Sequence, residues 1–190
     1  MKKWIKQLGA MRNRTNLRKR STRLGRRRLV IESLDIRIPF AVDLQLLKDV
    51  NSIPETVGSD PASFAAVGSS LYFAATINSS GAELWKSDGT DAGTLLVKDI
   101  NPGSGSASPS NFINIGGTLF FTANDGTNGV ELWKSDGTDA GTVMVKNIQA
   151  GSGSATPSSL ANISGTLFFN ANDGIDGAEL WKSDGTEPGP

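Results

Sequence analysis

The chain has 190 residues, a length that fits one ordinary domain, and its formal net charge at pH 7 is zero. It contains no cysteine and no histidine, which excludes disulfides, thiolate metal sites and every catalytic or metal-binding group that needs an imidazole. The charge is unevenly distributed. Residues 1–28 hold twelve Lys or Arg and no acidic residue, whereas the rest holds seven basic and all nineteen acidic residues, a net charge of −12. We therefore expect an acidic body with a separate basic arm.

The first part of the chain, residues 1–45, is expected to be this arm, disordered over residues 1–28. A secretory signal needs an apolar stretch of about 7 to 15 residues after its basic region, and none follows cleanly here. A solvated arm without an address function stays open as an alternative. Sequence-specific nucleic-acid binding is not expected, because Trp4 is the one aromatic residue interleaved with the basic ones.

The end of the arm carries a short motif, "RRRLVIESLDIRIPFAV" (26–42). It resembles the LEPR-XLL segment of large exported bacterial proteins, whose acidic, Leu, acidic and Arg positions are matched by Glu32, Leu34, Asp35 and Arg37. It departs from that pattern at Asp35, where Glu is usual, at Ser33, where Pro is common, and at 38–40, where leucines are expected. The resemblance implies that the arm accompanies export.

From residue 46 onward the sequence repeats itself with a period of 48 residues, which separates Trp85, Trp133 and Trp181. Residues 117–138 and 165–186 agree at 18 of 22 positions. The stretch "LLKDVNSIPE" (46–55) looks like a degenerate copy of "LVKDINPGSG" (96–105). We therefore treat 46–190 as one repeat region of about three units.

One unit predicts four short strands, at 111–116, 118–124, 130–135 and 142–148, because β-branched and aromatic residues alternate there with Gly and Asp-Gly turns. We expect β-structure from about residue 47 onward. In the aromatic strand, Leu119 and Phe121 should point to one side and Phe120 to the other. Trp133 is interpreted as a residue that packs one repeat on the next.

A four-stranded repeat of this length is typical of a β-propeller blade. The phrase "ELWKSDGTDAGT" resembles the ELWxxDGT repeat of large bacterial proteins. That resemblance implies an all-β, incomplete β-propeller-like array in an exported protein, and it implies no known catalytic residues. The third copy runs into "GTEPGP" before its fourth strand, so we expect a truncated product or a piece of a longer protein.

Two acidic loops and one glycine-rich stretch contain residue types that could bind ions. The loops "NDGTNGVE" (124–131) and "NDGIDGAE" (172–179) offer oxygen ligands for Ca²⁺, namely Asp125, Glu131, Asp173, Asp176 and Glu179. Their spacing is not that of an EF-hand loop, and Asp-Gly is first of all a turn. The Gly-x-Gly stretch at 101–110 lacks the rest of a phosphate-binding motif and is predicted to be a crossover between blades.

Paired carboxylates recur in every unit, as Glu83 with Asp88, Glu131 with Asp136, and Glu179 with Asp184. An enzyme needs one asymmetric site, so a repeated pair indicates a structural role. We therefore predict no catalytic, cofactor-binding or metal-binding residue. A transmembrane segment is not expected either, because polar residues interrupt the uncharged stretch 61–82.

These observations predict a non-enzymatic, exported repeat protein that acts outside the cell or at its surface as an interaction scaffold. Its partner would be an unknown protein or carbohydrate, with self-association through open blade faces. Two other classes stay open: a fragment of a propeller-type lyase or glycosidase, and a lectin-like binder.

Overall fold

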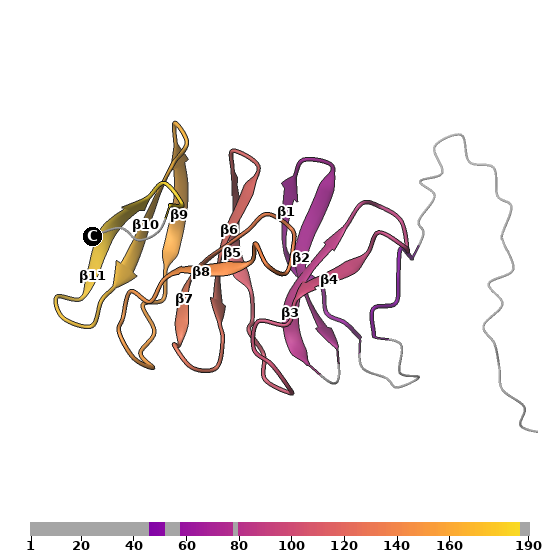
Figure 1. Cartoon of the computed structure of the whole chain (residues 1–190), viewed down its shortest axis with the longest axis horizontal. Coiled ribbons are helices and arrows are strands. Elements are labelled where there is room, and N and C mark those ends of the chain that lie inside the picture. Colours follow the sequence, from indigo (N-terminus) through magenta and orange to yellow (C-terminus); the bar gives the residue numbers. More distant parts are fainter. Residues whose placement is uncertain (1–45, 52–57, 78–79, 187–190) are drawn as a thin grey trace, which may run out of the picture. The chain divides into compact units, whose positions relative to one another are not determined.

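The described part of the chain is built from strands alone. The computed structural model describes residues 46–51, 58–77 and 80–186, and these contain no helix (Figure 1). They form three antiparallel sheets, one for each repeat. The predictions for the arm, residues 1–45, lie outside the described residues.

Each repeat forms one sheet, with its strands in chain order. The first sheet contains β1 (Ala62–Val67), β2 (Ser70–Ile77), β3 (Gly81–Ser87) and β4 (Leu95–Lys98). The second contains β5 (Ser110–Ile115), β6 (Thr118–Asn124), β7 (Val130–Ser135) and β8 (Val143–Lys146). The third contains β9 (Ser158–Ile163), β10 (Thr166–Asn172) and β11 (Ala178–Ser183). The four strands predicted between 111 and 148 are thus confirmed.

The sheets begin later than expected. Residues 46–51 and 58–61 carry no strand, and the first sheet starts at Ala62. The described residues from 46 onward are β-rich, as predicted, although these two stretches carry no strand. The physical reason is that no strand of the described residues pairs with 46–51 to complete a ladder of hydrogen bonds.

Tight glycine turns set the register of the strands. The turn between β5 and β6 has positive φ at both Gly116 (60°) and Gly117 (89°), and the turn between β9 and β10 at Ser164 (51°) and Gly165 (88°). Two positive φ angles define the type I′ turn, whose twist matches that of an antiparallel pair. The "GG" and "SG" dipeptides thus fix where each aromatic strand starts.

The core lies between the sheets. Leu119 and Phe121 pack in a cluster with Leu84 of the first sheet, whereas Phe120 packs in a second cluster with Phe169 of the third. This confirms the predicted alternation, and it shows that the second sheet is buried on both faces. Trp133 belongs to the first cluster, so the prediction that it packs one repeat on the next is also confirmed.

Candidate functional site

The Ser-Asp-Gly-Thr phrase forms a closed turn after the third strand of a repeat. In the second repeat, the Asp136 carboxylate accepts hydrogen bonds from the backbone N–H (2.8 Å) and hydroxyl (2.7 Å) of Thr138. The hydroxyls of Ser135 and Thr142 bond to each other at 2.7 Å across the turn. A Cβ atom on Gly141 would lie 2.0 Å from a carboxylate oxygen of Asp136, which explains the second glycine of the phrase.

The same turn recurs in the other two repeats, around Asp88 and Asp184. Hydrogen bonds from the hydroxyl and the N–H of the following threonine hold the pKa of all three aspartates below its usual range. These carboxyl groups therefore stay ionised at neutral pH and cannot donate a proton as general acids.

The glutamate of the Glu-Leu-Trp phrase is buried and binds the backbone of the loop that leads to the next sheet. The carboxylate of Glu83 accepts the backbone N–H groups of Ile100 (2.7 Å) and Ala107 (3.0 Å). These two residues flank the glycine-rich loop that leads from β4 to β5, so the predicted crossover is confirmed. The N–H groups at its two ends bind an anion of the protein's own chain, the Glu83 carboxylate.

Glu131 repeats this arrangement in the second sheet. Its carboxylate accepts the N–H groups of Ile148 (3.0 Å), Gln149 (3.4 Å) and Ala155 (3.3 Å). Glu179, at the same position of the third repeat, is exposed. Glu131 and Asp136 therefore bind different loops, and the paired carboxylates do not share a reacting centre.

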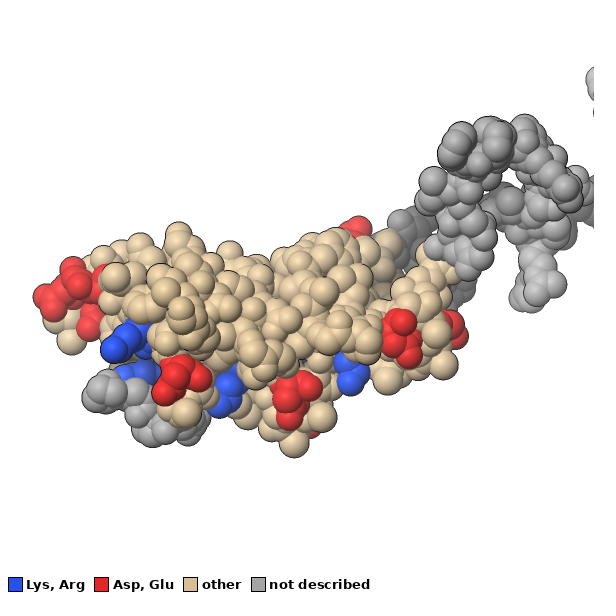
Figure 2. Space-filling view, turned by 90° about the horizontal axis from the view of Figure 1, so that it is seen from above, with Lys and Arg blue, Asp and Glu red and all other residues tan. Residues whose placement is uncertain are grey.

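Lysines connect each repeat to the next, which sequence reasoning missed. The Lys86 ammonium donates to the carbonyl of Gly137 at 2.7 Å, and Lys134 donates in the same way to Gly185. Lys98 forms a salt bridge with Asp139 at 3.2 Å. Figure 2 shows basic and acidic side chains alternating along one edge of the stack. In the sequence, a lysine at the end of a strand cannot be distinguished from any solvated lysine. The recurrence of the lysine once in each repeat was the one indication that it has a structural role.

The first aspartate of each acidic loop accepts hydrogen bonds from backbone N–H groups of the same loop. Asp125 accepts the N–H groups of Thr127 (2.9 Å) and Asn128 (2.8 Å), while Glu131 is committed to the crossover. Asp173 accepts the N–H of Ile175 at 2.9 Å in the equivalent loop. Within 46–51, 58–77 and 80–186, no three His, Cys, Asp or Glu side chains come together as a metal site would require. The loops are turns, as their Asp-Gly pairs indicate.

A cleft of about 490 Å³ lies between the second and third sheets. Phe120, Lys134, Asp136 and Asp184 are among its lining residues. The lysine already binds the carbonyl of Gly185, and a Cβ on that glycine would lie 2.7 Å from the buried Phe120 ring. The lysine of the cleft is thus engaged in the contact between repeats, the two aspartates accept hydrogen bonds within their own turns, and the aromatic ring is covered.

The buried glutamates predict a pH dependence of stability. Burial raises the pKa of Glu83 from 4.5 to about 7, although its backbone hydrogen bonds act in the opposite direction; burial also raises the pKa of Glu131. Between these two values the folded state holds the proton more tightly than the unfolded state, so this contribution to stability falls as the pH rises from about 4.5 to 7. Urea unfolding at several pH values should show this fall.

The double variant Glu83→Gln, Glu131→Gln provides the comparison for that measurement. The difference in unfolding free energy between the parent chain and this variant should fall as the pH rises from about 4.5 to 7 and be constant above about 7. A difference that is constant across the whole range would contradict the role of burial.

Among the described residues, no helix has the length and the apolar character needed to cross a bilayer. Comparisons of the chain with protein-family models, with curated proteins and with solved structures gave no match.

Proposed function

We propose that this chain is a non-enzymatic, exported repeat protein whose body is a propeller-like array and serves as an interaction or cell-surface scaffold. One observation carries the proposal. In the first two repeats, three charged residues of the recurring phrase hold the structure: the glutamate binds the crossover, the lysine binds the next repeat, and the first aspartate binds its own turn.

This assignment favours a scaffold over an enzyme. A general acid or base needs a carboxyl group that is free to meet a substrate. Glu83 and Glu131 are fully buried and bound by backbone N–H groups, and the pKa of Asp88, Asp136 and Asp184 lies below the usual range because threonines donate to them. The repeated phrase is thus best explained as a unit that stacks on copies of itself.

A propeller-like arrangement fits the way the sheets pack. Two sheets are four-stranded and antiparallel, and apolar side chains from neighbouring sheets meet face to face. In propellers, four to eight such sheets surround a channel. An array of three would leave its outer faces open to partners.

The proposal of export rests on the basic arm and on its likeness to the LEPR-XLL segment. It is tested by fusing residues 1–45 to a reporter enzyme that is active only outside the bacterial cytoplasm. The matched control is residues 46–190 fused to the same reporter. We expect activity with the first fusion and none with the second. A silent first fusion that accumulates intact in the cytoplasm would reject export.

A further inference from the structure

The outward face of the third sheet exposes a leucine that is buried at every inner junction. Leu84, Leu132 and Leu180 occupy the same position of the three repeats, and their exposed fractions are 0%, 1% and 80%. Leu84 and Leu132 each pack against the following sheet. Leu180 therefore marks a surface, here called the tail face, that corresponds in sequence position to an inner junction and that no other sheet of the described residues covers.

At the opposite end of the stack, the first sheet exposes a leucine whose equivalents in the other two sheets are buried. Leu71, Leu119 and Leu167 share one repeat position, and their exposed fractions are 41%, 0% and 0%. Beside Leu71 runs a groove of about 220 Å³, lined mainly by apolar side chains that include Leu46, Leu47, Phe64 and Phe73. We call this surface the head face.

The head face already carries a piece of a preceding repeat. Residues 47–51 (Leu-Lys-Asp-Val-Asn) match 97–101 (Val-Lys-Asp-Ile-Asn), the end of a fourth strand and the start of a crossover. Lys48 donates to the carbonyls of Asp91 (3.2 Å) and Thr94, as Lys98 does to the carbonyl of Asp139 (3.1 Å). The segment thus contacts the first sheet as a fourth strand would, and within the described part of the chain no third strand pairs with it.

Among the described residues, the third sheet has no fourth strand. In the described residues its order is β11-β10-β9, so the backbone of β11 lies at an edge. In the other two sheets the fourth strand pairs there, with Trp85 opposite Leu96 and Leu84 opposite Lys98. Applied to the third sheet, this register sets Trp181 opposite Leu46 and Leu180 opposite Lys48.

We propose that a second copy of this chain binds head to tail, so that residues 46–48 of one copy become the fourth strand of the other copy's third sheet. The tail face then covers the groove beside Leu71, and the packing of the inner junctions continues from one copy into the next. This single contact pairs the free edge of β11 with a segment that pairs with no strand in the described part of the chain. The inference names the partner for the scaffold proposed above, and it does not depend on export.

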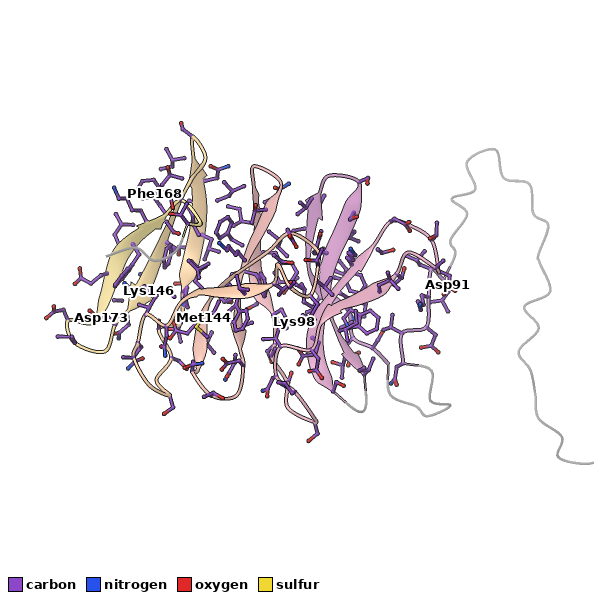
Figure 3. All side chains as sticks on the ribbon, in the orientation of Figure 1. Asp91, Lys98, Met144, Lys146, Phe168 and Asp173 are labelled. Carbon is purple, nitrogen blue, oxygen red and sulfur yellow. The ribbon has the colours of Figure 1, made fainter. Side chains whose placement is uncertain are left out.

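The polar contacts of the inner junctions have matching groups on the two end faces. Lys182 corresponds to Lys86 and Lys134, and in the complex it would donate to the carbonyl of Gly89 in the next copy. Gly137 and Gly185 lie against the rings of Tyr72 and Phe120, whereas a Cβ on Gly89 would meet nothing within 4 Å. The ring for that open position is Phe168 of the copy that supplies Lys182. Phe168 lies on the third sheet, while Asp91 lies at the opposite end of the stack (Figure 3).

The contact is heterologous, since two different surfaces meet, and this makes it testable by mixing. Leu71→Asp blocks the head face and Leu180→Asp blocks the tail face. Each substitution places an unpaired carboxylate at a position that is buried in an inner junction, so each should raise the dissociation constant by at least about a hundredfold. Sedimentation velocity of the 190-residue chain should show oligomers that grow with concentration, and each variant alone should be a monomer.

An equimolar mixture of the two variants is the decisive sample. One intact head and one intact tail remain, so the mixture should form a dimer and stop there. The circular dichroism spectrum of each variant must match that of the parent chain, and Leu46→Asp, at a side chain 84% exposed, is a second head variant. A parent chain that stays monomeric, variants that assemble like the parent, or a mixture that stays monomeric would each overturn the proposal. None of these results would bear on the export experiment.

Discussion

Replacing Trp133 with alanine is expected to lower the free energy of unfolding by about 3 to 5 kcal/mol. The indole is buried between the first and second sheets, in one cluster with Leu84, Val97 and Phe121. Its N–H has no hydrogen-bond partner among the described residues, so the loss should come from packing and from the cavity that the ring leaves. Urea unfolding followed by circular dichroism measures it without relying on tryptophan fluorescence.

Trp181→Ala is the matched control, because it removes the same side chain from the third repeat. That indole is only half-buried, and its N–H donates to the carbonyl of Ala171 at 3.0 Å. We expect a smaller loss for Trp181→Ala than for Trp133→Ala, both measured at a concentration where the chain is a monomer. A loss below about 1 kcal/mol for Trp133→Ala would contradict its role between the sheets.

The local structure of the repeat could be predicted from the sequence because its causes are local. Alternating apolar residues and Asp-Gly or Gly-Gly turns predict strands, and β6 (Thr118–Asn124) and β7 (Val130–Ser135) have the predicted bounds. The opposite directions of Phe120 and Phe121 follow from the pleat of a strand. The recurrence of Trp133 in every unit was enough to predict that it packs between repeats.

The contacts that join the repeats could not be predicted, because their partners lie far along the chain. Glu131 binds residues 17, 18 and 24 positions away, and Lys86 reaches a carbonyl 51 positions away. A period indicates that a residue recurs, but it does not say which backbone group the side chain meets. Residues 46–51 show the same limit, since a strand needs a neighbour that the sequence pattern does not name.

Replacing Glu131 with alanine is expected to destabilise the body by about 3 to 5 kcal/mol. The substitution leaves the N–H groups of Ile148, Gln149 and Ala155 without their acceptor, and a buried donor without a partner costs about 1 to 3 kcal/mol. Ile148 and Ala155 are themselves buried, so water cannot replace the carboxylate without opening the junction with the third sheet. The crossover should loosen first.

Glu179→Ala removes the same side chain from the third repeat, where it is exposed, and should change the free energy of unfolding by less than about 0.5 kcal/mol. Two measurements distinguish a carboxylate that holds the crossover from one that is merely buried. Urea unfolding gives the total loss, and amide hydrogen exchange reports Ile148 and Ala155 directly. In the Glu131→Ala variant these two amides should exchange faster than those of β6, whose ladder is intact. If their protection is unchanged while the sheets remain folded, then the carboxylate does not hold the crossover, and the recurrence of Glu in the phrase needs another cause.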